Sequence, residues 1–183
     1  MTDRGWRFTG NERKYLDEVL QHGFRASESG SMNERLEKKF AFMHNQKFAI
    51  TANSGTSTLH MALNAFGVGP GDEVIIPALT VAMCGFAVWQ CGATPVYADV
   101  SNDSFLMDPN DVRQKITKKT KAVMPVHMYG NMCDMTEIMK ISGEHNLFVL
   151  EDCAECLFAS DDKKRMSGTI GHVGSWSFEN SKH

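Results

Sequence analysis

Three groups of polar residues in this 183-residue chain are of types that could do chemistry. The first is a turn of Ser54, Gly55, Thr56 and Ser57, in which small hydroxyl residues flank a glycine just before a helical pattern. A helix N-terminus offers unpaired N–H groups and the positive end of a dipole, so this turn is suited to a phosphate. A plain helix N-cap is the alternative, because Ser and Thr are common caps.

The second group is acidic. The apolar run 147–150 leads directly into Glu151 and Asp152, and Glu155 follows three residues after Asp152. In open parallel sheets the residues at the carboxyl ends of the strands line the crevice where ligands bind. Helix-cap and first-turn positions explain one of these acids readily and all three less well. We therefore predict a functional role for Asp152.

The third group is the polar stretch that contains Lys182, which follows the apolar run 176–178. A lysine in a polar turn is by itself expected to be exposed and without a role. Together with a phosphate turn and a strand-end acid, however, it completes the set that pyridoxal phosphate chemistry requires. The lysine amine forms the Schiff base, the aspartate keeps the pyridine nitrogen protonated, and the turn holds the phosphate.

Alternating strand and helix patterns must position these groups. Short apolar runs predict strands over 48–51, 74–76, 96–98, 122–126 and 147–150, with a further one at 176–178. Helical spacing predicts helices over 11–21, 32–44, 56–66, 81–91, 109–116 and 135–145. This alternation predicts an α/β fold with a mostly parallel sheet covered by helices on both faces. We expect a helical segment over 1–46 and a cofactor-binding domain over 47–183.

Composition excludes several other classes of protein. With 42% apolar and 22% charged residues and a net charge of −3, the chain is typical of a globular domain and carries no basic field for nucleic acid. The absence of a long apolar run argues against a membrane protein. Five cysteines without framework spacing predict reduced thiols and a cytoplasmic location. Cys153 and Cys156 form a C-x-x-C pair without a second pair, so we expect no metal site.

Six ordered blocks of the sequence resemble the DegT/DnrJ/EryC1/StrS family of pyridoxal-phosphate-dependent sugar aminotransferases. The blocks are 54–60, 69–77, 92–100, 120–130, 151–155 and 177–182. The resemblance implies the aspartate-aminotransferase-like fold, which is fold type I of the pyridoxal phosphate enzymes. It also implies that the chain is the N-terminal part of a longer protein, in which the rest of the large domain and a small domain follow.

The resemblance assigns roles to the three groups of residues. Lys182 is expected to be the catalytic residue that binds the cofactor covalently, and Asp152 to pair with the pyridine nitrogen. Gly55, Thr56 and Ser177 are expected to hold the phosphate. The other two residues of the turn, Ser54 and Ser57, are included in the predicted cofactor site.

Four further positions follow from the same resemblance. Glu155 stands near the ring hydroxyl, where the family usually has Gln or His, and this points to a branch similar to perosamine synthases. Val81 replaces the aromatic residue or His that usually stacks on the cofactor ring, and it offers only apolar contact. His127 and Tyr129 are expected at the substrate crevice, although either could equally be a core residue that ends a strand.

The activity implied is transfer of an amino group from an amino acid, L-glutamate in most of the family, to a keto group on a nucleotide-linked sugar. A homodimer is expected, without nucleic acid, membrane or metal partners. Two alternatives remain within the fold: a sugar dehydratase, which Lys182 disfavours because that branch has His there, and a catalytically silent truncated fragment. A dinucleotide-binding module is disfavoured because the turn at Gly55 lacks the G-x-G-x-x-G pattern.

Overall fold

The computed structural model describes residues 10–23 and 29–182, and the chain forms two compact units, Met1–Thr51 and Ala52–His183. The first unit holds helices α1 (Glu12–His22) and α2 (Met32–Met43). Ser31 caps α2 by accepting a hydrogen bond from the Glu34 backbone N at 3.2 Å. An ion pair of 2.7 Å between Glu34 and Lys38 supports the same turn of the helix. Both helices form where the apolar spacing predicts them.

The strand predicted over 48–51 does not form. Instead, the backbone N and the hydroxyl group of Thr51 both donate to Glu37 Oε1 at 2.8 Å. The backbone donor that a strand would need at this position therefore binds a carboxylate side chain. Apolar residues alone do not make a strand when no neighbouring strand accepts their hydrogen bonds.

The second unit is built on a five-stranded sheet in the order β2-β1-β3-β4-β5, and all of its strand pairs are parallel. The strands are β1 (Glu73–Pro77), β2 (Thr94–Ala98), β3 (Thr120–Val123), β4 (Phe148–Asp152) and β5 (Val173–Ser175). The helices are α3 (Gly55–Ala65), α4 (Met83–Gln90), α5 (Pro109–Lys115) and α6 (Met135–His145). This architecture confirms the predicted α/β class.

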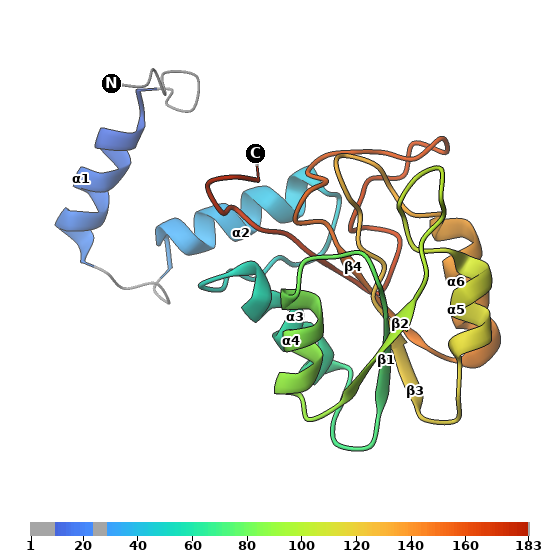
Figure 1. Ribbon diagram of the computed structural model, residues 1–183. Coiled ribbons are helices and arrows are strands. Elements are labelled where there is room, and N and C mark those ends of the chain that lie inside the picture. The colour runs from blue at the N-terminus through green and yellow to red at the C-terminus, as the bar shows by residue number, and fades with distance from the viewer. Residues whose placement is uncertain (1–9, 24–28, 183) are drawn as a thin grey trace. The chain divides into compact units, whose positions relative to one another are not determined.

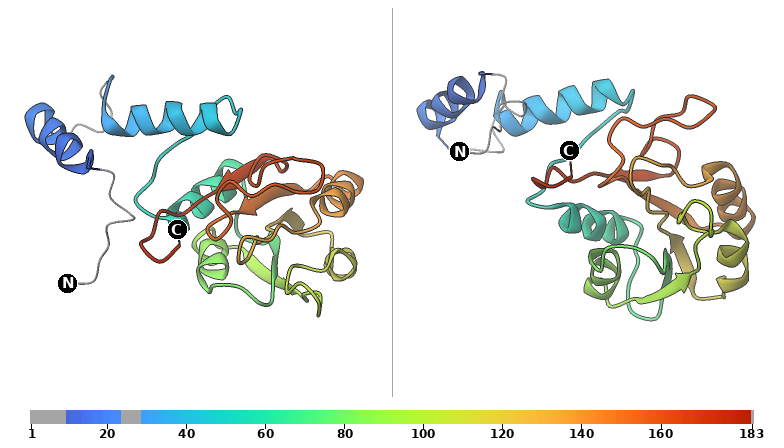
Figure 2. Two further views of the ribbon diagram at one scale, coloured as in Figure 1. Left: turned by 90° about the horizontal axis from the view of Figure 1, so that it is seen from above. Right: turned by 45° about the horizontal axis from the view of Figure 1, so that its top comes forward.

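Helices α3 and α4 cover one face of the sheet, and α5 and α6 cover the other (Figures 1 and 2). The strand order explains this arrangement. The chain moves outward from β1 to β2 and then crosses back over β1 to reach β3 and β4. Because crossovers between parallel strands are right-handed, the reversal of direction places α4 and α5 on opposite faces. A crevice for ligands is expected where the order reverses, at the carboxyl ends of β1 and β3.

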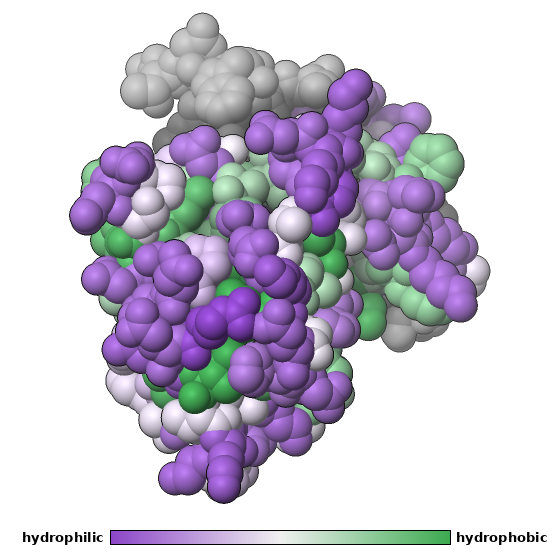
Figure 3. Space-filling model, turned by 90° about the vertical axis from the view of Figure 1, so that its right-hand side faces the viewer, coloured by the Kyte–Doolittle hydropathy of each residue, from purple (hydrophilic) through white to green (hydrophobic). Residues whose placement is uncertain are grey.

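The core lies between the sheet and these helices. Fully buried side chains come from α3 (Leu63), β1 (Ile75), α6 (Ile138) and β4 (Leu150). The side of the molecule that carries α5 and α6 is mainly hydrophilic (Figure 3), and an ion pair between Arg113 and Glu144 joins these two helices. Within the described ranges, no helix has both the length and the apolar character that crossing a membrane requires.

The last strand lies earlier in the chain than predicted. The apolar run 176–178 is not a strand, because pairing with β4 ends at Ser175, whose carbonyl oxygen accepts from the Cys153 N at 2.8 Å. The Trp176 ring packs instead against Gly168. Gly168 has a φ of +77°, and a Cβ added there would lie 2.1 Å from Trp176 Cζ2, so this position requires glycine.

Replacing Gly168 by Ala should therefore destabilise the fold. We expect the free energy of unfolding to fall by about 2–4 kcal/mol, because the new methyl group meets a rigid ring and the backbone is left-handed. Urea unfolding followed by circular dichroism measures this change. Gly143→Ala is the matched control: it lies in α6 with nothing within 4 Å of the new methyl group, so it should raise stability by about 0.5–1 kcal/mol. Equal effects of the two substitutions would contradict the packing described.

Candidate active site

The N-terminus of α3 combines a cap with free backbone donors. The Ser54 hydroxyl accepts from the Ser57 N at 3.2 Å, and the Ser57 hydroxyl donates to Asn53 Oδ1 at 2.6 Å. Ser54 is thus the N-cap, the alternative that the sequence left open, and Ser57 in the first turn provides the backbone N–H that Ser54 accepts. The backbone N–H groups of Gly55 and Thr56 lie in the first turn, where no intrahelical acceptor exists for them. They are therefore the donors available to an anion at this end of the helix.

Ser177 lies directly beside this helix end. A Cβ added to Gly55 would lie 3.0 Å from Ser177 Cβ and 3.4 Å from its hydroxyl oxygen. The segment after β5 runs past the start of α3 in both views of Figure 2. A second contact joins the same elements, because Thr58 Oγ1 lies 2.6 Å from Ser175 Oγ. The structure thus brings together Gly55, Thr56 and Ser177, a set of N–H and O–H donors that fits a phosphate.

Asp152 ends β4 and is only 6% exposed. Its Oδ1 accepts from the Ala154 N at 3.0 Å, and its Oδ2 accepts from the Cys84 thiol at 3.3 Å. Burial raises the pKa of Asp152, and the hydrogen bonds from Ala154 and Cys84 and the charge of Lys182 oppose this rise only in part. Among the described residues no cation forms an ion pair with it. A protonated pyridine nitrogen fits such a carboxylate, because it would supply the positive charge that a buried carboxylate needs.

Lys182 and Glu155 form an ion pair of 2.8 Å, with side chains 20% and 23% exposed. Both line a cavity of about 450 Å³, together with Tyr129, Gly130 and Ser181. Tyr129 and Gly130 have φ angles of +53° and +79°, and the Gly130 N donates to the Glu155 carbonyl oxygen at 2.9 Å. This tight turn leaves Tyr129 largely exposed at the cavity. Lys182, Glu155 and Tyr129, which are distant in the sequence, therefore meet here.

Val81 lies on the connection between β1 and α4 and is 44% exposed. The neighbouring Thr80 Oγ1 is 3.2 Å from Cys84 Sγ, and Cys84 contacts Asp152. The connection that carries Val81 is thus linked to Asp152 through Cys84. An apolar contact between Val81 and a cofactor ring stays a prediction.

His127 lies in the core and not in the crevice. Its side chain is 0% exposed, its Nε2 lies 3.0 Å from Glu151 Oε2, and its Nδ1 accepts from the Cys133 N at 3.1 Å. Of the two positions that the sequence left open, the structure places His127 in the interior. Because a ring with no exposed surface cannot touch a substrate, the prediction that His127 contacts the substrate is wrong for this structure.

Sequence reasoning missed Cys84, Thr58 and Ser175. The contact between Cys84 and Asp152 spans 68 residues, and the contact between Thr58 and Ser175 spans 117. No local pattern marks either one, because each depends on how a helix packs on the sheet. A small hydroxyl or thiol side chain was the available signal at each position, and such side chains are too common to single these three out.

A parallel sheet with a lysine and a buried aspartate at its crevice defines a class of α/β enzymes that bind a cofactor at the carboxyl ends of their strands. The chain belongs to the DegT/DnrJ/EryC1/StrS aminotransferase family, whose profile matches residues 7–183. Enzymes of this family depend on pyridoxal phosphate.

Individual relatives agree with this assignment. GDP-perosamine synthase of Escherichia coli O157:H7 is 42% identical over 174 residues, which cover 95% of this chain and 47% of that protein. The X-ray structure of the aminotransferase from Psychrobacter cryohalolentis is similar with a TM-score of 0.86 and 37% identity, over 93% of this chain and 43% of that one. The PLP-form of the putative sugar aminotransferase Spr1654 from Streptococcus pneumoniae has a TM-score of 0.83 and 29% identity, over 93% of this chain and 47% of that one. The chain spans about half the length of the curated relatives it matches.

The raised pKa of Asp152 predicts a pH-dependent cost to stability in the cofactor-free protein. The folded state binds this proton more tightly than the unfolded chain does, so the stabilisation present at low pH is lost as the pH rises through the folded pKa. Asp152→Asn removes that loss. We expect its melting temperature at pH 7 to exceed that of the native protein by roughly 2–4 °C, with the difference shrinking toward pH 4.

Thermal unfolding between pH 4 and pH 8 measures this effect. The control is Asp162→Asn, at an exposed position in the turn at residues 162 and 163, which should leave the melting temperature unchanged. An Asp152→Asn variant less stable than the native protein at pH 7 would show that the carboxylate is well solvated or paired.

Proposed function

We propose that the protein containing this chain transfers an amino group from L-glutamate to the keto carbon of a nucleotide-linked sugar, with pyridoxal phosphate as its cofactor. Similarity to GDP-perosamine synthases supports this proposal. Transamination is favoured over dehydration by the lysine at position 182, where the dehydratase branch has His.

The residues present fit the cofactor. Gly55, Thr56 and Ser177 would hold its phosphate, Asp152 its protonated ring nitrogen, and Lys182 its carbonyl carbon. When bound, pyridoxal phosphate supplies an electron sink that stabilises negative charge at the carbon that carries the amino group. The observation that carries the proposal is the convergence of these residues at the strand ends of one unit, Ala52–His183. We propose residues 47–183 as the cofactor-binding part.

The side chains around Lys182 have separable tasks. Glu155 holds the Lys182 amine in place and balances its charge when Nζ is protonated. Lys182 must lose that proton to act as a nucleophile and then as a general base, and it returns the proton as a general acid. The buried charge of Asp152, on the side of α4, favours the protonated ring nitrogen of the cofactor. The cavity beside Tyr129 offers room for the sugar.

We further propose that the intact protein is a cytoplasmic homodimer. All five cysteines are free thiols, which supports a reducing compartment. Phe86 and Trp89 of α4 are 42% and 56% exposed, and their rings lie 5.5 Å apart. This apolar surface supports burial against a second copy.

Substituting Lys182 tests the proposed function. Native protein mixed with pyridoxal phosphate should develop a visible absorption band, and borohydride should trap the cofactor on Lys182 in peptide mass spectra. Lys182→Ala should lose the band and reduce amino transfer to a nucleotide-linked keto sugar by about a thousandfold or more, because the nucleophile is gone. Lys118→Ala, at an exposed position, should behave as native. Trapping of the cofactor on another lysine would refute the assignment.

A further inference from the structure

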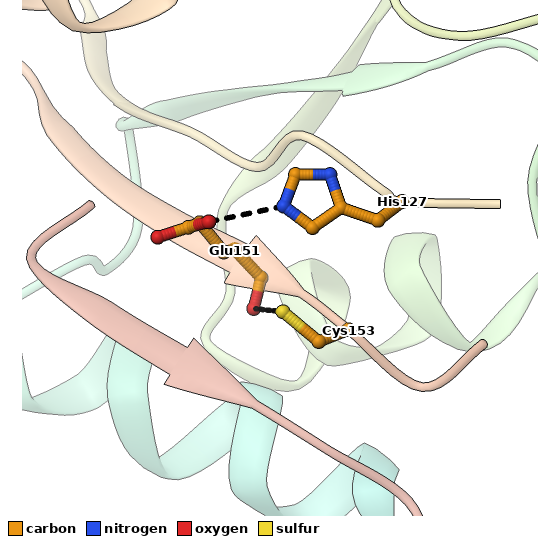
Figure 4. A group of neighbouring side chains, drawn as sticks. All are labelled: His127, Glu151 and Cys153. Carbon is orange, nitrogen blue, oxygen red and sulfur yellow. Dashed lines mark hydrogen bonds and ion pairs between the residues drawn. The ribbon is translucent and has the colours of Figure 1, made fainter. Parts of the chain in front are cut away.

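A second carboxylate at the end of β4 lies on the opposite face from Asp152. Glu151 is 0% exposed, as is its partner His127 (Figure 4). Glu151 Oε2 accepts from His127 Nε2 and from the Gly168 N, both at 3.0 Å. Glu151 Oε1 accepts from the Ile170 N at 2.7 Å and from the Gly171 N. Four N–H groups therefore surround one fully buried carboxylate.

The hydrogen bonds define the protonation states of this pair. The Cys133 N–H donates to His127 Nδ1, so Nδ1 carries a lone pair and the ring proton sits on Nε2, where it binds Glu151. In this arrangement Nε2 is the donor of the ring and Nδ1 is its acceptor. Burial alone would raise the pKa of Glu151, but the hydrogen bond and charge interaction with His127 and the hydrogen bonds from Gly171 and Gly168 outweigh it and lower the pKa. The carboxylate is charged and is stabilised by N–H dipoles.

A metal ion does not fit this cluster, although ligand atoms of His127, Glu151 and Cys153 lie within 4.8 Å of one another. Both ring nitrogens of His127 are engaged, and four N–H groups occupy the Glu151 oxygens. Burial also raises the pKa of the Cys153 thiol, which keeps it protonated. A cation would have to displace these hydrogen bonds. The side chains of His127 and Glu151 instead bind the backbone of neighbouring segments.

The segment held by Glu151 leads directly to the proposed cofactor ligands. Residues 168–171 precede β5, which pairs with β4 so that Gly174 lies opposite Glu151 and Ser175 opposite Asp152. The close approach of this loop to β4 depends on glycine. A Cβ added at Gly171 would lie 3.0 Å from the Val149 carbonyl oxygen and 3.2 Å from Glu151 Cγ. The chain then continues from β5 to residues 177 and 182.

We propose that Glu151, oriented by His127, is a positioning residue that clamps the 168–171 loop and thereby holds Ser177 and Lys182 in register with Asp152. The clamp itself follows from hydrogen bonds that involve no ligand. Its effect on the cofactor site rests on the proposed function. Neighbouring residues of a strand point to opposite faces, so Glu151 acts through β5 and not by contact with the site.

Hydrogen exchange on Glu151→Gln tests the clamp. The amide group of Gln presents an N–H₂ toward N–H donors that need acceptors, so we expect the backbone amides of 168–171 in the cofactor-free protein to exchange about tenfold faster or more than in the native protein. Glu144→Gln, which changes an exposed ion pair on α6, should leave this exchange unchanged. Native-like exchange at 168–171 in folded Glu151→Gln would overturn the proposal.

Cofactor affinity tests the effect on the site. Glu151→Gln should weaken binding of pyridoxal phosphate by about tenfold or more, at a temperature where it is fully folded. Faster exchange with unchanged affinity would overturn the positioning role and leave a structural clamp. A native protein that binds no pyridoxal phosphate would refute the proposed function, and the exchange result would still decide whether Glu151 holds the loop.

Experiments on His127 provide a second test of the clamp, which does not depend on whether Glu151→Gln folds. Nitrogen-15 NMR of labelled histidine should show that His127 carries its ring proton on Nε2 in the native protein, and a ring that is protonated on Nδ1 would overturn the proposal. His127→Gln keeps an N–H donor toward Glu151, so its loop exchange should stay within about threefold of native, whereas His127→Ala should raise it about tenfold. Equal effects of the two variants would contradict the orienting role.

Discussion

Two adjacent carboxylates end strand β4 on opposite faces of the sheet, and the proposed site depends on this alternation. Asp152 faces α4, where it meets the Cys84 thiol, whereas Glu151 faces the loop before β5. The two-residue period of a strand allows one short segment to serve both a ligand crevice and the scaffold behind it. A shift of one residue in the register of β4 would turn Asp152 away from α4 and Glu151 away from the loop before β5. Neither side chain would then reach its partners.

The two acids are buried in different ways, and the difference matches their tasks. Four N–H groups surround Glu151, so its charge is already stabilised by the protein. Asp152 receives one backbone N–H group and a weak thiol donor, and burial raises its pKa. A buried charge without compensation favours the binding of a cation. The protein thus fills the hydrogen-bonding capacity of Glu151, which holds the loop before β5, and leaves Asp152 available for a ligand.

Much of the fold could be predicted from local signals. Helix α6 forms over residues 135–145 as the apolar spacing predicts, with Asp134 as its cap. The α/β alternation was sufficient to predict a parallel sheet, because parallel strands need crossover helices. The strand at 48–51 failed because its backbone donor at Thr51 binds Glu37, and the run at 176–178 failed because pairing with β4 ends at Ser175. Both errors concern pairing partners, which an apolar run does not specify.

The sequence by itself determined the class of fold, the family and the positions of Lys182, Asp152 and the turn at Gly55, because these depend on residue types and short-range order. Only the tertiary structure decided which residues meet. It placed Ser177 against Gly55, Cys84 against Asp152, and Glu155 against Lys182. It also moved His127 from the expected crevice into the core, where Glu151 and the Cys133 backbone satisfy both ring nitrogens. Such contacts join segments far apart in the chain, and the packing of helices on a sheet determines them.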